Sequence, residues 1–143
     1  MGPIDSASVI PGWIRIIHTE NAGAAFGVLA DGGVLVRAAL LIGVSLAVVA
    51  FVAWALWSRY SSFTAPLTRF GLALILGGAI GNLYDRIVRG AVTDFFEVYH
   101  GAWSFPAFNV ADSAITIGAI FLLIDLLRNR RKGVEQQAGF AHK

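Results

Sequence analysis

The sequence predicts a mainly α-helical, integral membrane protein: a helical bundle of three spans with a small outer β cap. Composition is the first observation behind this prediction. Of the 143 residues, 57% are hydrophobic and 14% are charged, and the mean hydropathy is +0.69, whereas soluble domains carry about 25% charged residues. The second observation is that the apolar residues gather in long runs of the kind that cross a bilayer. The length allows a single domain over residues 1–143, and most of it requires lipid as its solvent.

The first run, Ala38–Trp57, consists of twenty consecutive uncharged and mostly apolar residues. As a helix with a rise of about 1.5 Å per residue, it would cross about 30 Å of hydrocarbon. Trp54 and Trp57 lie near its end, and Arg59 and Tyr60 follow, a combination typical of a membrane interface. This run predicts a transmembrane helix.

The second run, Phe70–Tyr84, has only fifteen residues before the charge of Asp85. It spans a membrane only if its helix begins earlier or continues past that charge. Pro66 suits the first turn of such a helix. Gly77 and Gly81 have the spacing that permits close contact with another helix, and we expect them to serve packing alone.

The third run, Val110–Leu127, carries Asp112 near its start and Asp125 near its end. A basic cluster of three arginines and one lysine follows at positions 128, 130, 131 and 132. Under the positive-inside rule we expect residues 128–143 to form a basic cytoplasmic tail, with Asp125 as a local charge partner of the arginines. A nucleic-acid patch would need a folded soluble face, so we expect no nucleic-acid partner.

The arginines of the first loop lie on the same side of this three-span layout as the basic cluster, which makes that side cytoplasmic. Residues 1–33 and 85–108 then lie together on the outer side. Two segments there, Trp13–His18 and Val92–Tyr99, are rich in β-branched and aromatic residues and predict short strands. They could pair into a small cap on the membrane surface.

Two outer aspartates are candidates for chemistry, because ionisable groups at the rim of an apolar span are costly. Asp112 shares a helical face with Asn109 and Thr116, although it could equally cap the helix N-terminus. Asp94 lies in an otherwise apolar strand, from which it could reach the same rim or face the surface. Two adjacent carboxyl groups shielded from water do not easily both ionise, so one keeps a proton while the other acts as a base. That arrangement suits an aspartic peptidase.

Other polar residues give weaker signals. Asp85 and Arg86 lie near Asn82 on one helical turn and suggest a structural ion pair. Asn21 opens a segment rich in Gly and Ala that could bring backbone groups close to an extended peptide.

The chain contains no cysteine, which excludes disulfides, thiolate metal sites and cysteine nucleophiles. Its three histidines, His18, His100 and His142, are too scattered to hold a metal, so we expect neither metal nor cofactor. The only lysines, Lys132 and Lys143, lie far from any outer serine, which argues against a Ser–Lys dyad.

Four segments together resemble the signature blocks of lipoprotein signal peptidase, also called signal peptidase II. They are NAGAAFG (21–27), GGAIGNLYDR (77–86), VTDFF (92–96) and FNVADSAIT (108–116), in the family's order and with similar spacing. The resemblance implies that Asp94 and Asp112 are the catalytic aspartates of a membrane aspartic endopeptidase. It also implies supporting, substrate-binding roles for Asn21, Asn82, Arg86 and Asn109 and a structural role for Asp85.

The resemblance further implies the substrate and the cellular location. The substrate would be a bacterial prolipoprotein carrying diacylglycerol on its cysteine, cut just before that cysteine. The enzyme would be a multi-pass protein of the bacterial cytoplasmic (inner) membrane, with its active site facing the outer, periplasmic side. We expect it to be a monomer that contacts membrane lipids and its lipid-modified substrate.

One departure from the family is expected. Members usually begin with a further transmembrane helix, giving four spans, and this chain has only Met1–Gly12 at that position. The alternative function is therefore a truncated, non-catalytic homologue or a small helical membrane interaction protein. A proton relay through Asp85, Asp94 and Asp112 is disfavoured, because a relay needs groups distributed through the membrane and these three cluster at one face.

Overall fold

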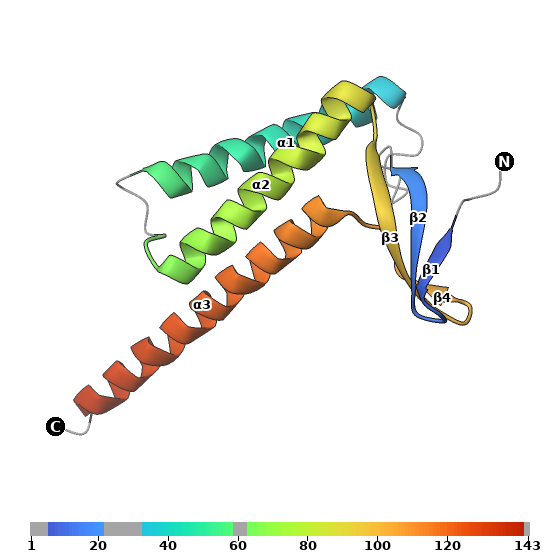
Figure 1. Ribbon diagram of the computed structural model, residues 1–143. Helices are drawn as coiled ribbons and strands as arrows, with labels where there is room; N and C mark the ends of the chain where they lie inside the picture. The colour runs from blue at the N-terminus through green and yellow to red at the C-terminus, as the bar shows by residue number, and fades with distance from the viewer. Residues whose placement is uncertain (1–5, 22–32, 59–62, 142–143) are drawn as a thin grey trace.

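The computed structural model describes residues 6–21, 33–58 and 63–141. This part of the chain forms the helices α1 (Val34–Trp57), α2 (Pro66–Arg89) and α3 (Val110–Ala141), and the strands β1 (Ala7–Ile10), β2 (Ile14–Asn21), β3 (Val92–His100) and β4 (Trp103–Ser104). The sheet lies at one end of the helices, where α2 ends and α3 begins (Figure 1). We call this the sheet end of the bundle, and the end where α1 stops and α2 starts the far end.

The three predicted spans are confirmed. Segments Ala38–Trp57, Pro66–Arg89 and Val110–Arg130 are long and apolar enough to cross a membrane, with mean hydropathies of 2.6, 1.3 and 2.0. The short second run is extended in both directions, because its helix begins at Pro66 and continues past Asp85 to Arg89. It ends at Gly90, whose φ of 79° provides the left-handed conformation that closes many helices.

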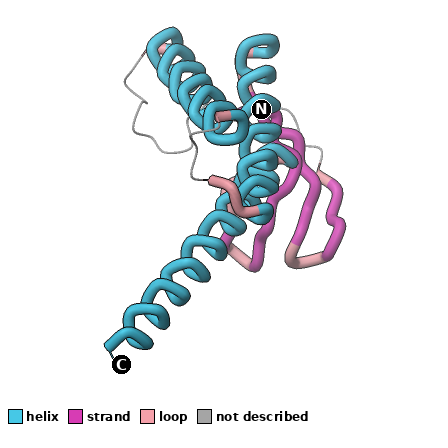
Figure 2. Tube along the Cα trace, turned by 90° about the vertical axis from the view of Figure 1, so that its left-hand side faces the viewer, coloured by secondary structure: helices cyan, strands magenta, loops and turns pink. Residues whose placement is uncertain are grey.

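Helix α3 continues beyond the predicted boundary. It runs to Ala141 rather than ending at Leu127, so the backbone of the expected basic tail is helical in that range. Residues such as Arg, Lys, Gln and Ala favour helix, so the polar sequence allows the helix to continue. The last turns of α3 extend away from α1 and α2 in both views (Figures 1 and 2).

The outer surface of the helices is apolar. Leu35, Trp57 and Val110 are 84%, 75% and 69% exposed. An apolar surface this large is unfavourable in contact with water. The buried core is correspondingly small and centres on Val52, Ala55 and Leu72 of α1 and α2. This distribution is the one expected when lipid surrounds the bundle.

Helix α2 packs against both α1 and α3. Its approach to α3 depends on small residues, because a Cβ on Gly71 would lie 2.7 Å from the Gly118 carbonyl oxygen and one on Gly118 would lie 2.5 Å from that of Gly71. A Cβ on Gly78 would lie 2.5 Å from the carbonyl oxygen of Ala111. Bare backbones therefore meet along this interface, as is common between membrane helices.

The prediction that Gly77 and Gly81 serve packing is wrong for Gly77. A Cβ on Gly77 would meet nothing within 4 Å, and one on Gly81 would make ordinary contact with the Ala111 Cβ at 3.6 Å. The close approach uses Gly71 and Gly78, which lie seven residues apart and therefore on one face of α2. The sequence spacing thus included one glycine that faces α3, Gly81, and missed the two at which the helices come closest.

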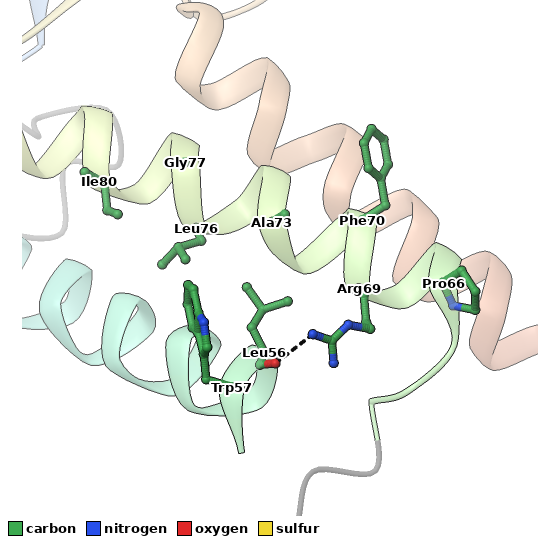
Figure 3. A pocket seen from close by; sticks show the side chains of 9 residues that line it. All are labelled: Leu56, Trp57, Pro66, Arg69, Phe70, Ala73, Leu76, Gly77 and Ile80. Carbon is green, nitrogen blue, oxygen red and sulfur yellow. Dashed lines mark hydrogen bonds between the residues drawn. The ribbon is translucent and has the colours of Figure 1, made fainter. Parts of the chain in front are cut away.

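A pocket of about 650 Å³ separates the end of α1 from the first turns of α2 (Figure 3). At its rim the Arg69 guanidinium donates a hydrogen bond of 2.9 Å to the carbonyl oxygen of Leu56. The last carbonyl groups of a helix have no partner within the helix, so Arg69 satisfies one of them and ties α2 to α1 at the far end.

The strands form one antiparallel arrangement in the order β1-β2-β3-β4. The two predicted strands are confirmed as β2 and β3, which pair from Ile14 opposite Val98 to Asn21 opposite Val92. The strands β1 and β4 were not predicted. Phe96 of β3 also forms a bridge with Phe108, which lies just before α3, so the sheet is attached to the start of that helix.

Candidate active site

Asp94 is buried at the sheet end of the bundle rather than exposed on the surface of the sheet. It lies in β3 opposite Thr19, and only 1% of it is exposed. Side chains two residues apart in a strand point to the same side, and Val92, at 2% exposure, shares that side. The possibility that Asp94 occupies a surface-facing strand position is therefore wrong.

Asp112 takes part in a reciprocal cap at the start of α3. The Asn109 side-chain oxygen accepts a hydrogen bond of 2.9 Å from the Asp112 backbone N–H. The Asp112 Oδ2 atom accepts one of 3.2 Å from the Asn109 backbone N–H. This arrangement is a capping box, in which two backbone N–H groups at the helix N-terminus each donate a hydrogen bond to the side chain of the other residue. The capping interpretation of Asp112 is thus correct for one of its oxygens.

The other oxygen of Asp112 belongs to a network that reaches Asp94. Asn82 of α2 donates its side-chain N–H to Asp112 Oδ1 at 2.7 Å. Asn109 donates from Nδ2 to the Asn82 side-chain oxygen at 3.2 Å and to Asp94 Oδ1 at 3.0 Å. The two carboxyl groups are therefore joined through two amides, one from α2 and one from the residue that precedes α3.

The partners in this network are well shielded from solvent. Asn82 and Asn109 are 7% and 5% exposed, and a buried polar group is costly unless it is hydrogen-bonded. Each asparagine both donates and accepts within the network, since an amide side chain has an N–H donor and an oxygen acceptor on separate atoms. The network fixes the ends of α2, α3 and β3 relative to one another at the sheet end.

Thr116 and Ser113 support the helix rather than the carboxyl groups. Thr116 donates to the Asp112 backbone carbonyl at 2.8 Å, and Ser113 donates to the Asn109 carbonyl at 3.0 Å. Both bonds lie within the first turns of α3. The shared face of Asn109, Asp112 and Thr116 therefore brings only the first two into the side-chain network.

Arg86 lies beside this network. Its guanidinium donates to the Asn82 backbone carbonyl at 3.4 Å, and its Nε–H is buried without a partner among the residues that the structure describes. Asp85 pairs with Arg89, at 3.6 Å, instead of with Arg86. The predicted ion pair at Asp85 thus has a different partner, because residues four apart face each other on a helix and adjacent residues do not.

Asn21 was also predicted to support the site. Its backbone pairs with Val92 at the end of β2, two residues from Asp94 along β3. The rest of its sequence block, residues 22–27, lies outside the described residues.

A cleft of about 620 Å³ opens beside Asp112. Phe105, Pro106 and Phe108 form one wall, and Ile117 with Thr116 lines the first turns of α3. Sequence reasoning did not identify this wall, although two aromatic residues flanking a proline next to the FNVADS block were a usable signal. An apolar, extended ligand in the cleft would lie against the Asp112 carboxyl group.

Carboxyl groups are the reactive side chains that the site offers. Among residues 6–21, 33–58 and 63–141, no three His, Cys, Asp or Glu side chains come together as a metal site would require. A pair of carboxyl groups joined by amides can exchange protons with a water and a peptide bond. The geometry therefore suits acid–base hydrolysis.

Comparison with known proteins shows which family the chain belongs to. The signal peptidase (SPase) II family matches residues 2–128 of this chain. The lipoprotein signal peptidase of Solibacter usitatus is 46% identical over 129 residues, which cover 90% of this chain and 77% of that protein. The lipoprotein signal peptidase of Cupriavidus taiwanensis is 44% identical over 123 residues, covering 86% of this chain and 68% of that protein.

Solved structures agree with these relatives. Two structures of bacterial membrane enzymes, obtained by the in meso method at 2.3 and 1.9 Å resolution, match with a TM-score of 0.74 each and with 29% and 31% identity. They cover 91% and 89% of this chain and 75% and 77% of the solved chains. The family match, the named relatives and the fold lead to one conclusion: this chain, an integral membrane protein, belongs to the signal peptidase II family.

Proposed function

We propose that this chain is an aspartic endopeptidase that removes the signal peptide from diacylglyceryl-modified bacterial prolipoproteins, cutting just before the lipidated cysteine. Family membership supports a protease that acts on prolipoproteins. The observation that carries the aspartic mechanism is the connection of Asp94 to Asp112 through the amides of Asn109 and Asn82. Asp94 and Asp112 are the catalytic residues in this proposal.

The two carboxyl groups divide the work between them. The ionised carboxylate takes a proton from a water molecule, whose oxygen then attacks the scissile carbonyl carbon. The protonated carboxyl group donates its proton to the carbonyl oxygen, which gives a tetrahedral diol. As the C–N bond breaks, the carboxyl group that took the water proton passes it to the leaving nitrogen, and the other carboxylate recovers a proton from a diol hydroxyl, which restores the starting pair. The mechanism requires that the pair hold one proton between them, the arrangement by which paired carboxyl groups act as acid and base in aspartic peptidases.

The asparagines position the catalytic pair. Asn82 donates a side-chain N–H to Asp112 and Asn109 donates one to Asp94, and these bonds orient the carboxyl oxygens for the substrate. We assign the unpaired Nε–H of Arg86 and the backbone of Asn21 to binding the substrate, with Asp85 holding Arg89 as a structural contact.

The cleft beside Asp112 suits the apolar residues next to the cut. Its wall of Phe105, Pro106 and Phe108 is continuous with the start of the α3 span, so a substrate anchored in the bilayer would reach it without leaving the membrane surface. We place the sheet end on the periplasmic side of the inner membrane, because the exposed Arg128 and Arg130 lie toward the opposite end of α3. We propose that the enzyme acts as a monomer.

The non-catalytic alternative is not favoured, since the relatives at 40% to 46% identity are peptidases by name. The test is cleavage, in nanodiscs, of one precursor prepared with and without diacylglycerol on its cysteine. The modified precursor should be cut before that cysteine, and the unmodified one should remain intact. Equal cleavage of both precursors would contradict the proposal that the enzyme recognises the diacylglyceryl group.

A further inference from the structure

A further carboxylate, in addition to the catalytic pair, lies at the far end of the bundle. Asp125 belongs to the α3 span, and the buried Thr68 of α2 donates a hydrogen bond of 2.6 Å to its Oδ2 atom. Asn129 donates to the same oxygen at 3.4 Å. The described residues give Oδ1 no donor among these bonds, which leaves that oxygen available to a ligand.

The predicted role of Asp125 as a charge partner of arginines is wrong for the described residues. The ion pairs among them are Arg15–Glu97 and Arg89–Asp85, and neither involves Asp125. A carboxylate inside a membrane span without a cation is costly, and such residues usually have a functional partner. Among the described residues no cation pairs with Asp125, and a positively charged ligand would supply such a partner.

A pocket of about 540 Å³ lies against this carboxylate. Its walls are mostly apolar and come from Phe63, before α2, and from Leu122, Leu123 and Leu126 of α3. Leu123 and Leu126 are 54% and 53% exposed on the surface that faces lipid. The pocket therefore joins an apolar, lipid-facing opening to a carboxylate near the membrane interface.

We propose that this pocket binds a membrane phospholipid with a primary ammonium headgroup, whose N–H groups bond to Asp125 Oδ1 while an acyl chain lies against Leu123 and Leu126. Charge complementarity selects the ammonium, and the apolar walls select a lipid over a free amine. Arg128, one turn further along α3, is exposed and lies within reach of the phosphate of the same headgroup. The site is independent of the catalytic pair, which lies at the sheet end.

The test is lipid retention by the purified full chain, measured by native mass spectrometry. The probes are a phosphatidylethanolamine and a phosphatidylcholine with identical acyl chains, because a quaternary choline ammonium cannot donate an N–H hydrogen bond. The parent should retain the ethanolamine lipid by about tenfold over the choline lipid, the effect expected of one charge-assisted hydrogen bond. Asp125→Asn should abolish this preference, and Asp85→Asn, at the sheet end, should keep it.

A second variant protects the test against misfolding of Asp125→Asn. Leu126→Trp keeps the carboxylate and fills the pocket, so it should lower retention of both lipids. Equal retention of the two lipids by the parent, or an unchanged preference in Asp125→Asn, would overturn the proposal. Equally strong retention of free ethanolamine would also overturn it, by indicating a simple cation site.

Discussion

The side-chain amide of Asn109 donates a hydrogen bond of 3.0 Å to the Asp94 carboxylate, while the oxygen of the same amide caps the helix that carries Asp112. One residue thus serves the secondary structure and the catalytic pair together. The consequence is that β3 and α3 cannot shift relative to each other without breaking either the cap or the contact to Asp94.

These two roles of Asn109 can be separated by mutation. Asn109→Ser keeps a side-chain oxygen for the cap but removes the N–H groups that reach Asp94 and Asn82. Asn109→Ala removes both functions. We expect both variants to lose about 10- to 100-fold in kcat, because a hydrogen bond to a charged group is worth about 1.5–3 kcal/mol.

Stability should distinguish the same two variants. A serine cap is about as good as asparagine, and loss of a cap costs about 1 kcal/mol, so Asn109→Ala should unfold at a lower temperature than Asn109→Ser. Thermal unfolding in detergent, beside peptidase kinetics, measures both effects. Equal stability of the variants would contradict the capping role, and unchanged kcat would contradict the positioning role.

The contact between α2 and α3 predicts opposite outcomes for two glycines. Gly118→Ala should destabilise the protein by about 1–3 kcal/mol, because its Cβ would lie 2.5 Å from the Gly71 carbonyl oxygen. Gly77→Ala meets nothing within 4 Å and should be neutral or stabilising by up to about 1 kcal/mol, since alanine favours helix. Unfolding midpoints of the two variants provide the comparison. If Gly77→Ala lowered the midpoint more than Gly118→Ala, the assignment of the helix contact to Gly71, Gly78 and Gly118 would be contradicted.

The sheet contributes a pH-dependent stability. The Arg15 guanidinium bonds to the Glu97 carboxylate at 2.5 Å and lowers the pKa of that carboxyl group below its ordinary value of 4.5. Because the pKa is lowered on folding, the stabilisation is present above 4.5 and is lost as the pH falls below it through the folded value.

Arg15→Met provides the control for this effect, since it keeps an apolar stem over the Tyr99 ring, which lies 4.8 Å from the guanidinium carbon. The unfolding midpoint of the parent should fall more steeply than that of Arg15→Met as the pH is lowered through 4.5. Parallel curves for the two proteins would show that the ion pair contributes nothing to folding.

The sequence was sufficient for the features that depend on local patterns. A run of twenty uncharged, mostly apolar residues predicted α1, and two segments rich in β-branched and aromatic residues predicted β2 and β3. Both signals depend only on neighbouring residues in the sequence. The placement of Asp94 and Asp112 at the same end of the bundle, which the structure shows as one hydrogen-bonded network, followed from their positions near the starts of β3 and α3. Their chemistry was a hypothesis from charge in an apolar context, strengthened by the resemblance of four sequence blocks.

Features that depend on tertiary contacts were not predictable. The spacing of Gly77 and Gly81 matched a packing pattern, but which face of α2 meets α3 depends on the neighbouring helix. Asp125 lies close to arginines in sequence, yet its shorter hydrogen bond comes from Thr68, 57 residues away. The bridging position of Asn109 likewise requires knowing that β3 and α2 converge on the start of α3.

The most direct measurement of the central claim is single-turnover cleavage of a diacylglyceryl-modified prolipoprotein by the parent, Asp94→Asn and Asp112→Asn. Both changes keep the size of the side chain and remove its ability to exchange a proton. Glu20→Gln, at an exposed position of β2 in the same sheet, is the matched control. We predict that each aspartate variant, folded as judged by its unfolding midpoint, loses at least about 100-fold in rate while Glu20→Gln does not. Cleavage by either aspartate variant at close to the parent rate would contradict the assignment of this pair as the catalytic residues.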